Sequence, residues 1–529
     1  MITKKPIIWS ISGSDCSGGA GIAADIKTGH GLGVEVCTLI TANTVQNSNQ
    51  LVSVNPVSVD ILQQQVDALI TDKAPAVIKI GLLATLEQVM WLTTTLAFLK
   101  KEWPNLIVIY DPVGQASTGG TFNSLTSSDL SPLLQHVDVI TPNLIEANAL
   151  VNISLQEQIS AELLAEKIYH CFSINSIIIK GGHSSDNEEC FDYCYHQLNQ
   201  LKQDNQDKIH QAISYQLSSP RIASHYNHGG GCSFASALAS FLALGYLVRD
   251  AFTFSKAFIN QGLTATQEIS SSQHHKYYGA FEQLTFPYKS SSFPNVEDNI
   301  NQEYQSLPAF KRLNLHGEKL GLYPVIDSIA WLKRLLPLGL KIIQLRVKNL
   351  PKDELEQVII AAVALAKNTN TRLFINDYWQ LAIKHGAYGV HIGQEDLCDA
   401  DLAQVQQAGL RLGISTHGCY EFLLAQQLKP TYLAIGAIFP TKTKDMTGQI
   451  QGIKNLRQLL TLRPKQLDQQ IPVVAIGGIN LARAPAVLAT GVDSIAVVTA
   501  ITKTEQLSGK TPEQAVSEFL SLISPETID

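Results

Sequence analysis

The chain has 529 residues, which is too many for a single hydrophobic core, so two or more domains are expected. Its residues are 45% hydrophobic and 16% charged, as in an ordinary globular protein. A formal net charge of -7 and the lack of a long basic run argue against a nucleic-acid-binding protein.

The sequence contains no apolar run long enough for a signal peptide or a membrane helix, so a cytoplasmic protein is expected. The eight cysteines are scattered along the chain. Cys190 and Cys194 lie close together, but no second pair or histidine partner completes a zinc pattern. Reduced thiols are therefore expected.

Short apolar runs in the first half alternate with helical patterns, and small or polar residues follow each run. This arrangement predicts an open, doubly wound sheet whose ligands lie beyond the carboxyl ends of the strands. Gln46, Asp111 and Glu146 are among the residues at these ends. The predicted strands are residues 7–11, 39–44, 77–81, 106–110, 137–141 and 177–180.

A run of glycines, Gly229, Gly230 and Gly231, precedes Cys232 and a predicted helix at residues 234–245. Successive backbone amides at the start of a helix form an anion hole, and the positive end of the helix dipole would lower the pKa of Cys232. The alternative is that the glycines form only a flexible turn and that Cys232 is a small buried apolar residue.

Residues 7 to about 270 resemble the hydroxymethylpyrimidine/phosphomethylpyrimidine kinases of the ribokinase-like superfamily. The resemblance rests on the motifs SGSDCSGGAGIAADIKT, KIGLLA, DPV, TPNLIEANAL, IKGGH and HGGGCSFASALA. It implies ATP-dependent phosphorylation of the hydroxymethyl group and then of the resulting monophosphate. It also implies that Gln46 binds the pyrimidine, that Cys232 is the catalytic base beside the anion hole, and that Glu146 belongs to the motif associated with Mg²⁺-ATP.

The chain departs from that family in two places. Gly230 stands where the family usually has threonine, which removes a side-chain donor but leaves the backbone amides. After Val113, where the family tends to continue with a lysine and Ser-Gly, residues 115–120 read QASTGG. A cation facing phosphate is therefore not expected from this segment.

Residues 288–308 are rich in serine, asparagine, glutamine and acidic residues and have no sustained apolar period, so they read as a linker with little structure of its own. The expected organisation is a first domain at residues 1–287, a linker at 288–310 and a second domain at 311–529.

Eight predicted strands separated by helical patterns make up the second half. They fit a (β/α)₈ (TIM) barrel with its active site at the carboxyl ends of the strands. The predicted strands are residues 321–327, 341–346, 372–375, 389–392, 412–414, 432–437, 473–476 and 494–497.

Two acidic residues, Asp377 and Asp396, follow the third and fourth of these strands. Neighbouring parallel strands end on the same edge of a sheet, so the two carboxylates should converge. Mg²⁺ usually binds through one or two carboxylates and substrate phosphates, which suits such a pair. The alternative is that Asp377 caps the following helix and that Asp396 lies in a turn.

Alternation along the second strand places Gln344, Arg346 and Lys348 on one face, where they would meet a diphosphate at the barrel mouth. Residues 477–478 and 498–499 follow the late strands, where such barrels commonly bind phosphate.

Residues 319 to about 503 resemble thiamine-phosphate synthases through the motifs QLRVK, INDYWQLAIKHGAYGVHIGQEDL, GISTH, PTKTK and VAIGGI. The resemblance implies the joining of hydroxymethylpyrimidine diphosphate to thiazole phosphate with release of diphosphate. It implies that Asp377 and Asp396 bind Mg²⁺ and that Ser415 and Lys444 take part in catalysis. The implied contacts to the pyrimidine diphosphate are Gln344, Arg346, Lys348, Asn376, Ser415 and Lys444. Those to the thiazole phosphate are Thr441, Thr443, Gly478, Val498 and Thr499.

The sequence thus predicts a two-domain enzyme whose first domain makes the diphosphate that the second consumes. The expected partners are these small-molecule substrates, with ATP and Mg²⁺ and without nucleic acid or membrane, and the sequence is compatible with a homo-oligomer. One rival is an active synthase fused to a weakened kinase domain that only binds ligand, which the changes at Gly230 and after Val113 leave open. Another is a kinase of pyridoxal or a sugar-like alcohol, because the superfamily fold is shared; the fusion to a synthase argues against it.

Overall fold

The chain divides into two compact units, Met1–Asp298 and Asn299–Asp529, in the computed structural model. The structure describes residues 5–47, 50–114, 122, 124–182, 188–201, 208–222, 224, 228–272, 281–298, 303–304, 306–313, 320–441, 450–464, 466 and 470–523. Within these parts of the chain, no helix is both long and apolar enough to span a bilayer.

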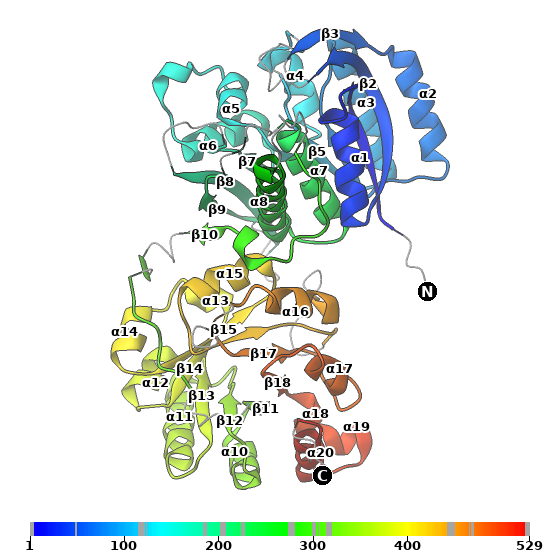
Figure 1. Cartoon of the computed structure of the whole chain (residues 1–529). Coiled ribbons are helices and arrows are strands. Elements are labelled where there is room, and N and C mark those ends of the chain that lie inside the picture. Colours follow the sequence, from blue (N-terminus) through cyan, green and yellow to red (C-terminus); the bar gives the residue numbers. More distant parts are fainter. Residues whose placement is uncertain are drawn as a thin grey trace. The chain divides into compact units, whose positions relative to one another are not determined.

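The first unit is built on a ten-stranded sheet (Figure 1). Its strands are β1 (Ile7–Asp15), β2 (Glu35–Gln46), β3 (Leu51–Pro56), β4 (Val77–Ile80), β5 (Ile107–Tyr110), β6 (Val139–Ile140), β7 (Ser176–Ile179), β8 (Glu189–Leu201), β9 (Lys208–Pro220) and β10 (Asn295–Glu297). Their order is β10-β9-β8-β7-β6-β5-β4-β1-β2-β3. Strands β7 to β2 in this order are parallel, and antiparallel strands flank them on both edges.

Helices cover this sheet. They are α1 (Gly21–Leu32), α2 (Val59–Ile70), α3 (Leu86–Glu102), α4 (Ser127–Leu134), α5 (Leu144–Leu150), α6 (Ala161–Phe172), α7 (Gly230–Ala243) and α8 (Val248–Ser272), with the 3₁₀ turns η1 (Leu155–Glu157) and η2 (Ser290–Ser292). Helix α7 contacts both α1 and α8, whereas α2 to α6 share the main hydrophobic cluster with the strands. Strands β4, β6 and β7 are fully buried, and β5 is buried except at Ile107, as expected for parallel strands between helical layers. The predicted doubly wound sheet is confirmed.

Four strands of the first unit were not among the predicted ones, and all lie toward the edges of the sheet: β3, β8, β9 and β10. The last of them falls inside the segment expected to be a linker. Val296 is fully buried, and β10 pairs antiparallel with β9, so residues 295–297 extend the sheet of the first unit. The structure differs from the expected linker at this point.

The second unit contains a closed barrel of eight parallel strands, in which β11 pairs with β18 (Figure 1). The strands are β11 (Gly321–Ile326), β12 (Ile342–Leu345), β13 (Arg372–Asn376), β14 (Gly389–Ile392), β15 (Arg411–Thr416), β16 (Tyr432–Ile435), β17 (Val473–Ile476) and β18 (Ser494–Val497). The barrel that the sequence predicts is confirmed. Its interior is filled by side chains, among them Tyr323, Phe374 and Tyr432, which make edge-to-face contacts.

The helices of the second unit follow the strands around the barrel. They are α10 (Ile329–Leu335), α11 (Lys352–Lys367), α12 (Trp379–Lys384), α13 (Gln394–Leu397), α14 (Leu402–Gln407), α15 (Cys419–Gln427), α16 (Gly452–Leu460), α17 (Ala484–Leu488), α18 (Thr499–Thr502), α19 (Thr504–Ser508) and α20 (Pro512–Ile523), with the 3₁₀ turn η3 (Leu336–Leu338). The carboxyl ends of all eight strands therefore open on one face of the barrel.

Two candidate active sites

The turn after β1 is held by the carboxylate of Asp15. This carboxylate accepts hydrogen bonds from the backbone amides of Ser17, Gly19 and Ala20 at 2.9, 3.0 and 2.8 Å and from His228 Nε2 at 2.9 Å. Burial alone would raise the pKa of Asp15, but the hydrogen bonds from His228 and the turn outweigh it and hold the pKa well below its usual range. Asp15 therefore remains ionised and ties this turn to the chain that leads into α7.

The glycine run allows α7 to begin against that turn. Gly229 has φ 84°, in the left-handed region, and a Cβ at this position would lie 1.8 Å from the carbonyl oxygen of Gly19. A Cβ at Gly230, in contrast, would meet no atom within 4 Å. The close approach of the two loops explains the glycine at position 229, and the backbone amides at the start of α7 can face an anion.

Cys232 lies in the first turn of α7 and is partly exposed. Burial of the thiol raises its pKa to about 11, although the ammonium of Lys79 acts in the opposite direction. The expectation of a lowered pKa is therefore wrong for the ligand-free chain. The cost of placing a thiolate in this partly dehydrated site exceeds the stabilisation from the helix start and from Lys79.

A cation and two acids lie near the start of α7. The ammonium of Lys180 is 2.7 Å from Asp111 Oδ1 and 3.6 Å from the position that a Cβ would take at Gly231. Burial raises the pKa of Glu146 to about 7; Lys180 lowers it, and Asp111 raises it. Glu146 also closes a capping box with Asn143, which is its structural role. Lys180 therefore places a cation beside the helix start.

A fully buried ion pair lies beneath Cys232. Lys79 Nζ on β4 is 3.0 Å from Asp25 Oδ2 on α1, and Asp25 also accepts hydrogen bonds from Ser10 and Ser236. Burial disfavours the ammonium, but the negative charge of Asp25 raises the pKa of Lys79 and keeps it protonated. These contacts join β1, β4, α1 and α7 under the candidate kinase site.

Gln46 ends β2 with its side chain buried. Its backbone carbonyl accepts a hydrogen bond from the thiol of Cys16 at 3.0 Å, and its amide oxygen Oε1 has no hydrogen-bond partner among the described residues. A buried amide oxygen without a partner is costly, so a ligand amino group would satisfy it.

At the barrel mouth, Asp377 directly follows β13 and adopts φ 66°, a conformation that aspartate tolerates better than most residues. Burial first, and then the charge of Asp396 and a hydrogen bond with it, raise the pKa of Asp377 to about 6, while Lys348 and Arg346 lower it. Two neighbouring carboxyl groups flanked by two cations are thus present. No group of three or more His, Cys, Asp or Glu residues that could hold a metal occurs among the described residues, so a metal here would need ligands from a substrate as well.

A hydrogen-bonded chain of buried side chains runs from the barrel core to Ser415 at the end of β15. His391 on β14 joins Ser415 Oγ through Nε2 and Tyr432 OH through Nδ1, both at 2.8 Å. Tyr432 OH lies 2.7 Å from Tyr323 OH, which accepts a hydrogen bond from Gln344 at 3.3 Å. Burial lowers the pKa of His391 to about 3, and Arg346 lowers it further, so this imidazole is neutral at pH 7.

The remaining predicted residues of the barrel lie at other strand ends. Asn376 is buried and ends β13, Gly478 follows β17 with φ 62°, and Val498 and Thr499 follow β18. Thr441 is described after β16, whereas Thr443 and Lys444 lie outside the described residues. The structure therefore tests neither of the last two positions.

Several residues of these sites were not singled out from the sequence: Lys79, Lys180, His391 and Tyr432. Lys180 directly follows β7, so the strand-end rule that selected other residues could have found it. His391 and Tyr432 carried the weaker signal of a polar group inside an otherwise apolar strand. Their contact joins residues 41 positions apart, which no local pattern reveals.

Comparison with known proteins gives separate matches for the two halves. The family model described as phosphomethylpyrimidine kinase matches residues 15–277, and that described as thiamine monophosphate synthase matches residues 322–501. Thiamine-phosphate synthase of Yersinia pseudotuberculosis serotype O:1b is 53% identical over 206 residues, which are 39% of this chain and 91% of that protein. The synthase of Salmonella paratyphi B is 58% identical over 185 residues, covering 35% and 85% respectively.

Solved structures resemble the two halves more distantly. Staphylococcus aureus pyridoxal kinase in complex with ADP is 24% identical, with a TM-score of 0.44, and the match covers 55% of this chain and 98% of that one. Pyrococcus furiosus thiamine phosphate pyrophosphorylase is 29% identical, with a TM-score of 0.34 and coverage of 40% and 98%.

The doubly wound domain and the barrel, each with polar groups at its strand ends, define a bifunctional transferase that joins a kinase domain to a TIM-barrel synthase. The chain belongs to the thiamine-phosphate synthase family through its second half, and its first half is a phosphomethylpyrimidine kinase domain. The chain therefore contains the domains for both steps in thiamine biosynthesis, the kinase step and the synthase step. No finding favours the rival interpretation, in which the kinase domain is weakened and only binds ligand.

Proposed function

We propose that the first domain transfers phosphate from ATP to hydroxymethylpyrimidine and then to its monophosphate. Gln46 receives the pyrimidine through its unpartnered amide oxygen, and the amides of Gly229, Gly230 and Gly231 face the transferred phosphate. Cys232 takes the proton of the hydroxymethyl group as its oxygen attacks the terminal phosphorus, and ADP leaves. Lys180 neutralises the developing negative charge beside the helix start, and Glu146 serves the Mg²⁺-ATP complex.

In the second domain, Gln344, Arg346, Lys348, Asn376, Ser415 and Lys444 hold the pyrimidine diphosphate. The thiazole phosphate contacts Thr441, Thr443, Gly478, Val498 and Thr499. When bound by Asp377 and Asp396, Mg²⁺ supplies positive charge for the diphosphate. Breakage of the C–O bond leaves a pyrimidine-stabilised cation and diphosphate, and the lone pair of the thiazole nitrogen then forms the new C–N bond. No general base is needed at that nitrogen, because it carries no proton.

The observation that carries the synthase proposal is the pair of carboxyl groups at the barrel mouth. Burial and, after it, repulsion by the charge of Asp396 raise the pKa of Asp377 to about 6, and Lys348 and Arg346 lie close enough to oppose that rise. A divalent cation would relieve this repulsion, and the two basic residues would meet the diphosphate that the cation brings with it. The chemistry of the donor set therefore fits Mg²⁺ together with a diphosphate.

The decisive assay supplies the whole chain with hydroxymethylpyrimidine, thiazole phosphate, ATP and Mg²⁺. Thiamine phosphate is the expected product, and leaving out ATP should abolish it. Adding preformed pyrimidine diphosphate in place of ATP and the free pyrimidine should restore it. A chain that makes thiamine phosphate from the preformed diphosphate but not from the free pyrimidine would contradict the kinase half of the proposal.

We also propose that the enzyme is cytoplasmic. Light scattering would measure its oligomeric state.

A further inference from the structure

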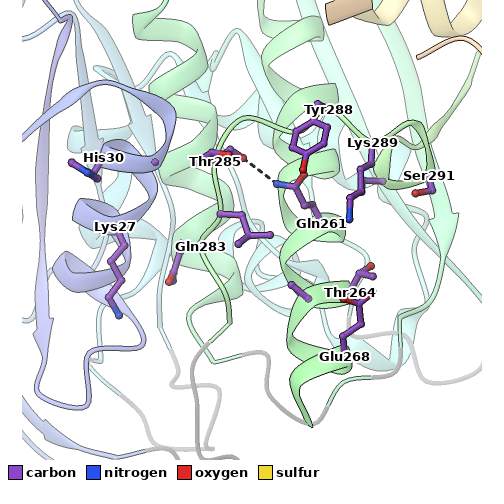
Figure 2. A pocket seen from close by; sticks show the side chains of 14 residues that line it. Lys27, His30, Gln261, Thr264, Glu268, Gln283, Thr285, Tyr288, Lys289 and Ser291 are labelled. Atoms are coloured by element: carbon purple, nitrogen blue, oxygen red, sulfur yellow. Dashed lines mark hydrogen bonds between the residues drawn. The ribbon is translucent and has the colours of Figure 1, made fainter. Parts of the chain in front are cut away.

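A cavity of about 610 Å³ opens on the surface of the first unit, lined by α1, α8 and the segment at residues 283–292 (Figure 2). It lies against the later turns of α1 and the second half of α8. None of the residues that we assign to the kinase site lines it. Its volume is in the range that encloses a small organic ligand.

The lining is rich in basic and hydrogen-bonding groups although the chain as a whole is acidic. Lys27, His30 and Lys289 are exposed in the cavity, where Glu268 is the single acidic residue of the lining. Among the described residues, neither Lys27 nor Lys289 forms an ion pair with a carboxylate. Two ammonium groups without carboxylate partners, surrounded by amides and hydroxyls, suit an anion such as a phosphate ester.

The cavity also offers an aromatic surface. Tyr288 is 57% exposed and lies beside Lys289 in the segment that crosses the cavity (Figure 2). Gln261 on α8 fixes that segment, because its amide donates to the carbonyl of Thr285 at 3.0 Å. An exposed ring next to a cation can pack against the organic part of a phosphate ester while the ammonium binds its phosphate.

Two hydrogen bonds connect this cavity to the kinase site. Lys27 Nζ donates to the carbonyl oxygen of Gly18 at 2.7 Å, within the turn that Asp15 holds. Gln283 Nε2 donates to the hydroxyl of Ser233 at 3.2 Å, and Ser233 directly follows Cys232. An anion that attracts the ammonium of Lys27 would weaken its hydrogen bond to Gly18. Occupancy of the cavity would therefore loosen the turn after β1 that Asp15 holds.

We propose that this cavity is a regulatory site for a small, ring-bearing phosphate monoester, and that its occupancy lowers the rate of the kinase. The binding part of the proposal stands independently, whereas the regulatory part rests on the kinase function.

The test uses the full chain with phenyl phosphate as the probe and inorganic phosphate for comparison. Calorimetry measures binding, and initial rates measure phosphorylation of hydroxymethylpyrimidine. Lys289→Gln should weaken phenyl phosphate binding about tenfold, as expected for the loss of one charged hydrogen bond, and leave the basal kinase rate unchanged. Lys101→Gln, at the end of α3 and outside the cavity, is the matched control and should bind as the parent does. Lys27→Gln should lower the basal rate, because it removes the bond to Gly18.

Inhibition by phenyl phosphate should be noncompetitive with both ATP and pyrimidine and should weaken in Lys289→Gln by the same factor as binding. The regulatory site would be overturned if Lys289→Gln and Lys101→Gln bound phenyl phosphate with equal affinity. It would also be overturned if excess ATP or pyrimidine removed the inhibition. Inorganic phosphate that binds as tightly as phenyl phosphate would overturn the role of the ring. If the probe binds as expected to a chain that does not phosphorylate the pyrimidine, the kinase function fails and the cavity assignment stands.

Discussion

At the scale of single residues, each candidate site contains an ionisable group whose pKa differs from its usual value. The thiol of Cys232 and the carboxyl of Asp377 both have raised pKa values, because burial disfavours their charged forms. The function that we propose requires each of them to lose its proton. At pH 7 the carboxyl of Asp377, with a pKa of about 6, is already mostly ionised, whereas the thiol of Cys232, with a pKa of about 11, is protonated. Substrate binding must therefore stabilise the thiolate of Cys232, and this can be measured.

Cys232→Ala should abolish phosphorylation of hydroxymethylpyrimidine and leave the synthase unchanged when preformed diphosphate is supplied. With a pKa of about 11, the thiol of the free chain should react with iodoacetamide about tenfold faster for each unit of pH from 7 to 9. Mass spectrometry of the peptide that contains Cys232 follows this alkylation. Kinase activity of Cys232→Ala within a few-fold of the parent would remove the thiol from the mechanism.

Asp377→Asn should weaken Mg²⁺-dependent synthase turnover yet stabilise the fold. The folded-state pKa of Asp377 lies near 6, above the ordinary 3.8, so the ionised carboxylate costs stability. This loss of folding stability grows as pH rises from about 4 to about 6 and is constant at higher pH. Because solvent screens the charge, we expect the loss to be roughly 1 to 2 kcal/mol. Urea unfolding at pH 4 and pH 8 should show the stabilisation mainly at pH 8. A variant less stable than the parent at pH 8, or a Mg²⁺ titration identical to the parent's, would contradict the assignment.

Tyr432→Phe should lower both the stability of the barrel and synthase turnover. It removes the hydroxyl that joins His391 to Tyr323, leaving two buried polar groups short of a partner at a cost of about 1 to 3 kcal/mol. The substitution also removes the hydrogen bond that orients the His391 ring, and this ring is hydrogen-bonded to Ser415. Tyr388→Phe is the matched control, because the buried Tyr388 hydroxyl has no hydrogen-bond partner among the described residues. Equal unfolding free energies for the two variants would argue against the network.

At the scale of elements, the start of α7 decides whether the kinase site can form. The helix begins within van der Waals contact of the turn after β1, and the carboxylate of Asp15 bonds to that turn and to His228. Residues more than 200 positions apart in the sequence thus build the one surface that we propose binds an anion. Its geometry depends on backbone that only glycine permits at position 229.

Gly229→Ala should eliminate kinase activity and spare the synthase. The added Cβ would lie 1.8 Å from the carbonyl oxygen of Gly19, and the left-handed φ of 84° adds about 1 kcal/mol of strain. Gly230→Thr restores the residue usual in the family and should be tolerated, since a Cβ there meets no atom within 4 Å. Kinase assays of both variants, with synthase assays on the same samples, test the expectation. If both variants lost kinase activity to the same extent, the glycines would be needed for backbone flexibility and not for the close approach of the two loops.

At the scale of the whole molecule, the chain consists of two units that each contain their own core and their own strand-end site. The boundary lies after β10 and not at residue 287, because β10 supplies the buried Val296 and a hydrogen bond from Gln216 to Glu297 at 2.6 Å. The predicted linker bounds therefore need testing with fragments.

Fragments 1–298 and 299–529 should each fold and keep their separate activities, and their mixture should make thiamine phosphate from the free pyrimidine. Fragment 1–287 should be less stable than 1–298, because it lacks β10 and exposes the edge of β9. Circular dichroism during thermal unfolding compares the two. If fragment 1–298 folds only when fragment 299–529 is added, independent folding is refuted. If fragments 1–287 and 1–298 unfold at the same temperature, the stabilising role of β10 is refuted.

The sequence by itself determined the features that depend on near neighbours in the chain. Apolar runs followed by polar residues located the parallel core of the first sheet and all eight barrel strands, and the same pattern placed Asp377 and Asp396 at the barrel mouth. The antiparallel strands β3, β8, β9 and β10 were not predicted from it. Edge strands need only one apolar face or a few residues, so their local signal is weak.

Only the tertiary structure decided the pKa of Cys232, the path from Ser415 to Tyr323 and the position of Lys180 beside α7. The glycine run predicted a lowered pKa because a helix start stabilises a thiolate. Burial outweighed this effect, and burial is produced by residues that are distant in the sequence. The free energy of a charge or a hydrogen bond depends on everything packed around it, so the sequence could locate the polar groups but could not give their protonation states or partners.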